Sequence, residues 1–428
     1  MQLTGSAAPY LNFRLVLLIF PCFSFLLFLS LSSSNNNIFS TFTPLTNFLS
    51  NLSSPSLTYS DSTSESVLDS TRLRNEDKRK KELLLRSRIA VCLVGGARKF
   101  ELTGPSIAEN ILNVYPNADL FLNSPLDKDS FKFSIFKDIA PSIASIRIFK
   151  PTKLDETEFQ RRVLTPSGSP NGRQGLLQYF NLVEGCLTLI NAFQIQNNFT
   201  YDWIVRTRVD GYWNAPLAPD NFLPNDHYLV PSGSRYGGCN DRLGIGNLDT
   251  SQIALSRLSL IPQLDAAGFR QLNSETAFKD QLTTQGVKFL ENRLPFCIVS
   301  ARRLGFPPNG LPVASMSSPG PLSGAYCRPC TPICVGPCAD DIMAILPSWS
   351  RIDGENGTLQ FCDAHGEWES GWENNFDRFA GEKLVQLRKR VIESKFEKCV
   401  KDFDEMKKRT VNWDAPAATH ICGIVSRR

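Results

Sequence analysis

Three charged residues in an otherwise apolar stretch are the side chains of this sequence best placed to do chemistry. Residues 201–213 begin with apolar and β-branched side chains typical of a buried strand and then present Arg206, Arg208 and Asp210. Because side chains alternate across a strand, these three lie on one face. Ligands in open α/β sheets bind beyond the C-terminal ends of the strands. The pattern therefore predicts two guanidiniums and a carboxylate at a ligand-binding edge.

Two interpretations of this cluster stay open at the level of sequence. One is a structural ion pair between Asp210 and either Arg206 or Arg208, because such networks also occur where no ligand binds. The other is a diphosphate site, because arginine forks bind phosphate oxygens in pairs and Asp210 is suited to a divalent cation or a ribose hydroxyl. Gly211 follows directly and would let a ligand approach the backbone closely.

The composition is that of a globular protein. Of the 428 residues, 42% are hydrophobic, which is enough for a substantial core. The formal net charge of +4 and the pI of about 8.4 are too weakly basic to favour a nucleic-acid partner. The length leaves room for one large domain or two smaller ones after the N-terminal part.

A long apolar run near the N-terminus predicts a membrane anchor. Residues 15–31 are almost wholly apolar, and with the three residues before Arg14 they reach about the length that crosses a bilayer. The positive charge on the N-terminal side favours a cytosolic tail at residues 1–10 and a lumenal remainder. We therefore expect an uncleaved signal anchor over residues 11–31. A cleaved signal peptide and a secreted protein are the alternative, because small residues follow at 30–34.

Polar residues dominate the next segment. Residues 32–69 are rich in Ser, Asn, Thr and Pro and cannot bury enough apolar surface to fold alone. Residues 72–88 are strongly basic with interleaved acids, which favours a solvated helix over a segment that binds polyanions. We predict a disordered stem over residues 32–87 and a globular domain from about residue 88.

Alternating strand and helix patterns predict an α/β domain after this stem. Residues 89–94 form a short continuous apolar run, typical of a buried parallel strand, that ends at Gly95, Gly96 and Arg98. The glycines would let a nucleotide lie close to the backbone, where Arg98 could meet its phosphates. We also predict strands at residues 118–122, 143–149, 228–230, 286–289 and 295–300, and helices at 106–114, 175–193, 251–260 and 273–285.

The order of these segments resembles a known family. A strand ending in Gly-Gly-Ala-Arg, the stretch Tyr-Pro-Asn-Ala-Asp-Leu-Phe-Leu, a long helix and Tyr-Asp-Trp-Ile-Val-Arg-Thr-Arg-Val-Asp follow one another over about residues 88–296. This order is similar to that of membrane-anchored, uncharacterised glycosyltransferase-like proteins of plants. The resemblance implies the GT-A nucleotide-sugar transferase fold over residues 88–310, a Rossmann-like mixed sheet flanked by helices. It also implies an acidic motif that holds Mn²⁺ or Mg²⁺ and the nucleotide diphosphate, with Asp210 at the matching position.

One position departs from this family pattern. Most such enzymes have two acids spaced Asp-x-Asp, whereas the residue two positions before Asp210 is Arg208. Arg206 and Arg208 could neutralise a diphosphate without a cation, so the sequence leaves metal dependence open.

Two further acids are candidates for proton transfer. The resemblance implies that Asp241, in a glycine-containing segment, lies on the acceptor side of the cleft, and that Glu275 lies in a shared helix start. An inverting glycosyl transfer needs a carboxylate that takes a proton from the acceptor hydroxyl. Both residues also have structural explanations, because Asn240-Asp241 suits a turn and an acid in the first turn of a helix contacts free backbone amides.

The cysteines predict an oxidising compartment. Four of the twelve form a cluster amid Pro and Gly, at Cys327, Cys330, Cys334 and Cys338. The spacing suits zinc, but closely spaced cysteines in a lumen more often form disulfides, which we favour. Further cysteines are available for pairing, namely Cys239, Cys297, Cys362, Cys399 and Cys422, whereas we expect Cys92 to be a buried core thiol. Residues 311–428 are thus predicted to be a Cys-rich loop followed by a helical extension, with one amphipathic helical segment at 377–409.

Together these features predict a single-pass type II Golgi glycosyltransferase that moves a sugar from a nucleotide sugar to a glycan or glycoprotein hydroxyl. Glycosylation triplets at Asn51, Asn198 and Asn356 agree with a lumenal domain. The donor phosphates would meet Arg98, Arg206 and Arg208. A catalytically inactive sugar-binding or scaffolding relative is the alternative, because a fold does not by itself give activity. A secreted cysteine-rich interaction module is a third possibility.

Overall fold

The computed structural model describes residues 63–424 except 168, 224–225, 304–312 and 346–357. The anchor predicted at residues 11–31 and the glycosylation triplets at Asn51 and Asn356 lie outside the described residues. Among those that are described, no helix is long and apolar enough to cross a membrane. Helix α3 (Thr63–Arg86) occupies the end of the segment predicted as a disordered stem and agrees with the solvated helix expected at residues 72–88.

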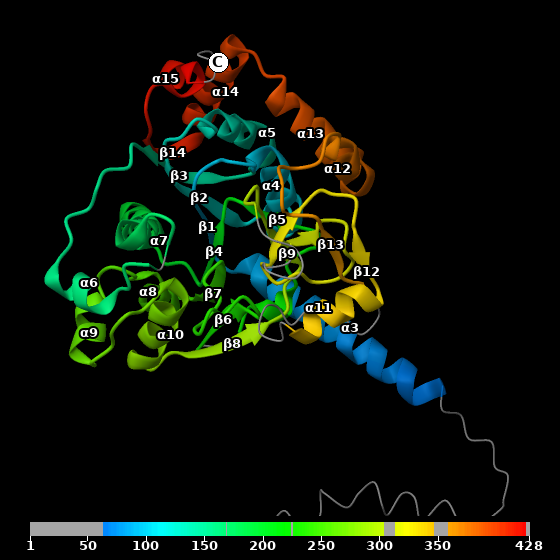
Figure 1. The fold of residues 1–428 in the computed structure, drawn as a ribbon, viewed down its shortest axis with the longest axis horizontal. Helices are drawn as coiled ribbons and strands as arrows, with labels where there is room; N and C mark the ends of the chain where they lie inside the picture. Colours follow the sequence, from blue (N-terminus) through cyan, green and yellow to red (C-terminus); the bar gives the residue numbers. More distant parts are fainter. Residues whose placement is uncertain (1–62, 168, 224–225, 304–312, 346–357, 425–428) are drawn as a thin grey trace, which may run out of the picture. The chain divides into compact units, whose positions relative to one another are not determined.

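An eight-stranded mixed sheet forms the centre of the fold (Figure 1). From one edge to the other its strands are β14 (Thr410–Asp414), β3 (Ile143–Phe149), β2 (Ala118–Pro125), β1 (Ile89–Val94), β4 (Trp203–Arg208), β7 (Leu243–Asn247), β6 (His227–Pro231) and β8 (Lys288–Asn292). The strands from β14 to β4 are parallel, and β7 runs antiparallel to both of its neighbours. All residues of β1 are buried, which explains its continuous apolar sequence.

Helices cover both faces of this sheet. Alternate residues of β1 belong to two apolar clusters, one with Ile89, Val91 and Leu93 and the other with Ala90, Cys92 and Val94. The first cluster includes α4 (Phe100–Ile107), η2 (Ala108–Leu112), η3 (Ser130–Ile135), α5 (Phe136–Ile139), α14 (Phe396–Arg409) and α15 (Ala418–Gly423). The second includes α7 (Gly172–Asn197) and α8 (Leu248–Leu255). Next to α7 lie α6 (Glu158–Val163), α9 (Ile261–Ala266) and α10 (Ser274–Thr284), as Figure 1 shows.

A second sheet begins just after β4, where the chain leaves the first sheet. Its six strands, in order, are β12 (Cys334–Val335), β13 (Gln360–Cys362), β10 (Val313–Ser315), β11 (Tyr326–Arg328), β9 (Phe296–Val299) and β5 (Gly211–Trp213). Only Val209 and Asp210 separate β4 from β5, so the chain changes sheets at these two residues. The single strand expected over residues 201–213 is therefore wrong, because its two halves pair with different partners, β1 and β9.

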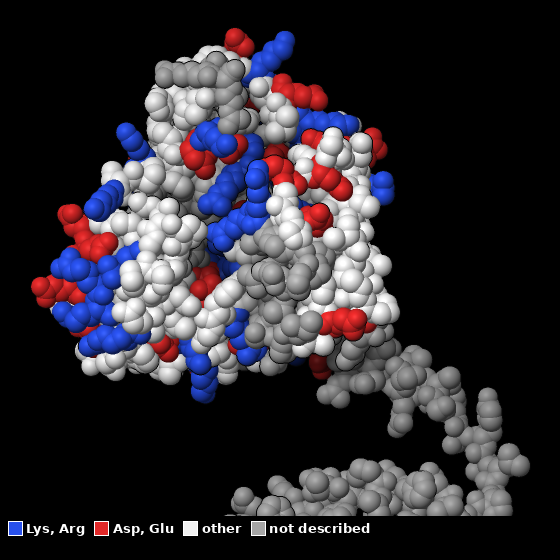
Figure 2. Space-filling view, viewed as in Figure 1, with Lys and Arg blue, Asp and Glu red and all other residues white. Residues whose placement is uncertain are grey.

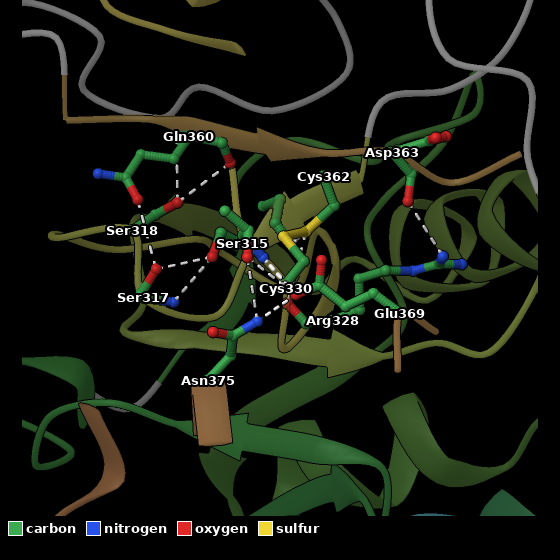
Figure 3. The surroundings of a disulfide bond; sticks show 12 residues. Ser315, Ser317, Ser318, Arg328, Cys330, Gln360, Cys362, Asp363, Glu369 and Asn375 are labelled. Carbon is green, nitrogen blue, oxygen red and sulfur yellow. Dashed lines mark hydrogen bonds between the residues drawn. A yellow bond between two sulfur atoms is a disulfide. The ribbon is translucent and has the colours of Figure 1, made fainter. Parts of the chain in front are cut away.

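Five disulfides link described residues: Cys92–Cys186, Cys297–Cys327, Cys330–Cys362, Cys334–Cys338 and Cys399–Cys422. The preference for disulfides over zinc is confirmed, although two cysteines of the four-cysteine cluster bond outside it. Figure 3 shows Cys330–Cys362, with Ser318 hydrogen-bonded to the backbone of Gln360 beside it.

Two cysteine predictions need correction. Cys92 is not a free core thiol, because it faces α7 and bonds to Cys186 there. Closing a loop of 94 residues stabilises a fold by about 4.7 kcal/mol, mainly by restricting the unfolded chain. Cys239 is a buried free thiol, not a disulfide partner.

The C-terminal part is built into the same unit as the preceding residues. Residues on both sides of position 310 share both sheets, since β14 joins the first and β10 to β13 join β5 and β9 in the second. Thr71–Arg428 accordingly forms one unit. The helical segment expected at 377–409 is three helices, α12 (Trp372–Ala380), α13 (Glu382–Ile392) and α14. Gly381 with φ 78° separates α12 from α13, and residues 393–395 separate α13 from α14. The remaining short helices are η4 (Pro219–Asn221) and α11 (Pro337–Ile345).

Candidate functional site

A cleft of about 480 Å³ opens where β1 and β4 end. From β1 the chain adds β2 and β3 on one side and then crosses through α7 to place β4 on the other side of β1. In open α/β sheets such a reversal of strand order leaves a crevice at the C-terminal strand ends where ligands bind. Figure 2 shows a hollow near the middle of this face, with lysine and arginine side chains gathered along its margin.

Most of the residues singled out from the sequence meet in this cleft. Seven of the eight line it, namely Gly95, Gly96, Arg98, Arg208, Asp210, Asp241 and Glu275. The eighth, Arg206, is fully buried, and its Nη1 donates a hydrogen bond to the backbone oxygen of Asp241. The eight residues come from four segments that are distant in the sequence.

The loop after β1 is held by both glycine geometry and a buried ion pair. Gly95 has φ 119°, a conformation that favours glycine, and a Cβ on Gly96 would overlap the carboxylate of Asp127. Beneath the loop, buried Lys132 pairs with Glu101 at 2.7 Å and donates to the backbone oxygen of Arg98. The Arg98 guanidinium is exposed and makes no hydrogen bond to any described residue. A fixed backbone therefore presents a cation with open donors.

Arg208 and Asp210 form a two-pronged ion pair within the cleft. Arg208 Nε donates to Asp210 Oδ1 at 2.8 Å, and Nη2 donates to Oδ2 at 2.7 Å. Burial opposes ionisation of Asp210, but the charge and hydrogen bonds of Arg208 outweigh it and lower the pKa of this carboxyl. Burial also opposes the charge of Arg208, yet Asp210 raises the pKa of that guanidinium. The ion pair considered from the sequence is therefore present, with Arg208 as the partner.

The donor set around Asp210 does not fit a divalent cation. Both carboxylate oxygens already accept hydrogen bonds from Arg208, and a guanidinium at that distance repels a second cation. Within the described part of the chain, no three His, Cys, Asp or Glu side chains are grouped as metal ligands. A metal at Asp210 would need Arg208 to move away.

The two acids proposed for proton transfer lie close enough to interact. Ser274 Oγ donates to Asp241 Oδ2, and buried Arg257 Nη2 lies 3.9 Å from the same oxygen. Burial, with the negative charge of Asp241, raises the pKa of Glu275 to about 8. Glu275 therefore exchanges a proton close to neutral pH, which suits a general acid or base.

A tight contact between a loop and a helix start brings these acids together. Asn273 caps α10 by accepting from the backbone nitrogen of Thr276 at 2.8 Å. The backbone nitrogen of Cys239 donates to the backbone oxygen of Glu275 at 3.1 Å. A Cβ on Gly238 would overlap the Glu275 backbone, so glycine is needed for the close approach. This contact places Asp241 next to α10.

Sequence analysis missed three arginines of the site. Arg257 is fully buried between the rings of Phe180 and Phe278, at 4.5 and 4.6 Å from their centroids. Arg242 is buried against Tyr326, and Arg302 lines the cleft and donates to Tyr326 Oη at 3.1 Å. Arg242 directly follows Asp241, so the sequence could have indicated it as a site residue. The residues around Arg257 and Arg302 contain no motif that indicates a binding site.

Positive charge is in excess at the cleft. Three arginines and three acids line it, and Arg206, Arg242 and Arg257 are buried nearby. Even with Asp127 behind Gly96, the cations outnumber the acids. Within the described structure, two nitrogens of Arg206 and two of Arg257 have no hydrogen-bond partner. Buried donors without partners beside a cleft favour an anionic ligand.

Fold and site together define a mixed α/β protein with an arginine-rich cleft at the reversal of strand order. The chain belongs to the family described as a domain of unknown function (DUF7796), whose model matches residues 84–428. The match spans both sheets and every residue lining the cleft. No curated protein matches the chain.

Proposed function

We propose that this protein is a glycosyltransferase of the GT-A type that takes a nucleoside diphosphate sugar as donor and a glycan or glycoprotein hydroxyl as acceptor. The observation that carries the proposal is the cleft, which joins a glycine turn, excess arginines and a pair of interacting acids at the end of β1 and β4. The central mixed sheet with helices on both faces supports this fold type. The similarity of residues 88–296 to membrane-anchored plant glycosyltransferase-like proteins supports the same assignment.

The residues of the cleft suit the two halves of the reaction. The acceptor oxygen attacks the anomeric carbon, the bond to the diphosphate oxygen breaks, and the diphosphate leaves with the electron pair. Arg98 and Arg208 would stabilise that negative charge, supported by buried Arg206. The acceptor proton passes to a carboxylate. Ionised Glu275 suits this role better than Asp241, because an oxygen of Asp241 is already held by Ser274, and with a pKa of about 8 the ionised form of Glu275 increases as pH rises toward 8.

A catalytically inactive, sugar-binding relative is the second candidate. The Arg208–Asp210 ion pair favours it, because the carboxylate expected to hold a metal is instead neutralised by an arginine. Such a protein would still bind the nucleotide sugar in the cleft but would not transfer the sugar.

A Golgi membrane location remains part of the proposal. Five disulfides among the described residues support an oxidising compartment, which agrees with a lumenal domain on an N-terminal type II anchor. Asn198 is exposed at the C-terminal cap of α7, with φ 52°, where a glycosylation enzyme could reach it.

Binding and turnover of donors by the full chain in detergent micelles test the proposal. We expect UDP or GDP sugars to raise the unfolding temperature and to release nucleoside diphosphate when an acceptor is present. CMP sugars, which lack a diphosphate, should have a smaller effect. If no nucleoside diphosphate sugar stabilises the protein, the proposal fails, while stabilisation without release would favour the inactive relative.

A further inference from the structure

The fork of Arg208 is already occupied by the carboxylate of Asp210, although the proposed function requires it to bind a diphosphate. We propose that Asp210 is a built-in substitute for the ligand's phosphate, which holds Arg208 until an anion displaces it, and that the site binds the diphosphate without a divalent cation. This inference rests on the proposed function. It reverses the role that an acid at this position has in a metal-dependent site.

The geometry of the pair matches the interaction that a phosphate would make. Nε and Nη2 of Arg208 donate in parallel to two oxygens of one group, at 2.8 and 2.7 Å. Two oxygens of a phosphate present the same spacing to an arginine fork. The side chain of Arg208 is 26% exposed and that of Asp210 only 8%, so the arginine is the more accessible partner.

Backbone contacts determine which partner can move. The backbone nitrogen of Val209 donates to Val94 at 3.0 Å, and the backbone oxygen of Asp210 accepts from Val299 at 2.9 Å. Asp210 is thus fixed between the two sheets on a short side chain. Arg208 carries its guanidinium on three methylene groups and can turn toward the cleft.

The charges around the pair allow the exchange. Arg98 and buried Arg242 also attract Asp210 and lower its pKa, so the carboxylate is not left isolated when Arg208 turns away. The exposed guanidinium of Arg98 lines the same cleft and can donate hydrogen bonds to the same anion. The incoming diphosphate therefore meets a site whose positive charge comes from arginine side chains.

Two substitutions separate this inference from a metal site, because they act with opposite signs. Asp210→Asn removes the competing carboxylate, so we expect UDP, GDP and inorganic pyrophosphate to bind about three- to tenfold more tightly. Arg208→Gln should weaken their binding about 10- to 100-fold. A metal ligand at this position predicts that Asp210→Asn loses binding. Arg270→Gln removes an exposed arginine outside the cleft and serves as the charge-matched control.

Isothermal titration of the full chain in detergent micelles, in EDTA and in Mn²⁺, measures these affinities. We expect the wild type to bind equally well in both. Binding that requires Mn²⁺, or that Asp210→Asn abolishes in a folded protein, would overturn the inference and leave the proposed function standing. Failure of the wild type to bind any of the three probes in either condition would instead overturn the proposed function. Should Asp210→Asn not fold, the wild-type titration in EDTA decides the cation question, and Arg208→Lys, which keeps the charge without the fork, should bind with intermediate affinity.

Discussion

The two sides of the cleft shift the pKa of their carboxyl groups in opposite directions. At the end of β4, Asp210 is buried but faces Arg208, and its pKa is lowered. At the start of α10, Glu275 is half-buried beside another acid, Asp241, and its pKa rises to about 8. The charged form of the carboxyl group is therefore favoured on one side and the protonated form on the other. Burial raises the pKa of both carboxyl groups, but the Arg208 cation reverses this at Asp210 whereas the negative charge of Asp241 adds to it at Glu275.

Replacing Glu275 should have the largest effect. We expect Glu275→Gln to reduce sugar transfer about 100- to 10,000-fold, because the amide cannot exchange the acceptor proton, while nucleoside diphosphate binding changes little. The rate of nucleoside diphosphate release with acceptor measures this. Asp280→Asn, on the same helix but outside the cleft, is the control. An unchanged rate in Glu275→Gln would show that Glu275 does not accept the acceptor proton.

Stability should depend on pH through the same residue. The folded-state pKa of Glu275 is about 8, above its ordinary value of 4.5, so the unfolded chain loses this proton first as pH rises. The contribution of Glu275 to the free energy of unfolding is therefore fully present below about pH 4.5 and lost as pH rises to about 8. Denaturant titrations across this range should show a slope that Glu275→Gln reduces. Equal slopes in both proteins would contradict the raised pKa.

Separating the loop from α10 should lower stability. Gly238→Ala places a Cβ against the backbone of Glu275, and we expect a loss of about 2 kcal/mol in the free energy of unfolding. Urea denaturation measures it. Gly366→Ala, where a Cβ meets nothing within 4 Å, should change stability very little. Comparable values for the two variants would show that the contact is looser than described.

Removing the charge next to Glu275 should move its titration. In Asp241→Asn the neighbouring negative charge is absent, so we expect the Glu275 pKa to fall toward its ordinary value, with burial still raising it. The pH dependence of the transfer rate, or NMR of labelled glutamate, reports the midpoint. A midpoint that stays at its wild-type value would assign the shift to burial alone.

The smallest effect is expected at Arg98, on the electrostatic side. Because its side chain is exposed, Arg98→Gln should change the free energy of unfolding by less than about 0.5 kcal/mol. Pyrophosphate affinity should fall about three- to tenfold through the loss of one charged contact. Arg270→Gln should leave that affinity unchanged, and a similar fall in both variants would indicate a general charge effect.

Regular elements with continuous apolar or helical patterns were predictable from the sequence. The predicted strands at residues 89–94 and 143–149 coincide with β1 and β3, because buried parallel strands need apolar residues on both faces. Strand β7 was missed because it contains Gly244 and Gly246. These glycines leave space for the ring of Tyr228, a contact with no counterpart in the local pattern.

The sequence by itself indicated that Arg208 and Asp210 lie close together at the end of a buried strand, because only one residue separates them in the chain. It also determined the glycine turn after β1. Only the tertiary structure decided that Asp241 meets Ser274, 33 residues later, and that Arg257 lies beneath them. Such contacts depend on how a loop packs against a helix start, and no local spacing encodes that packing.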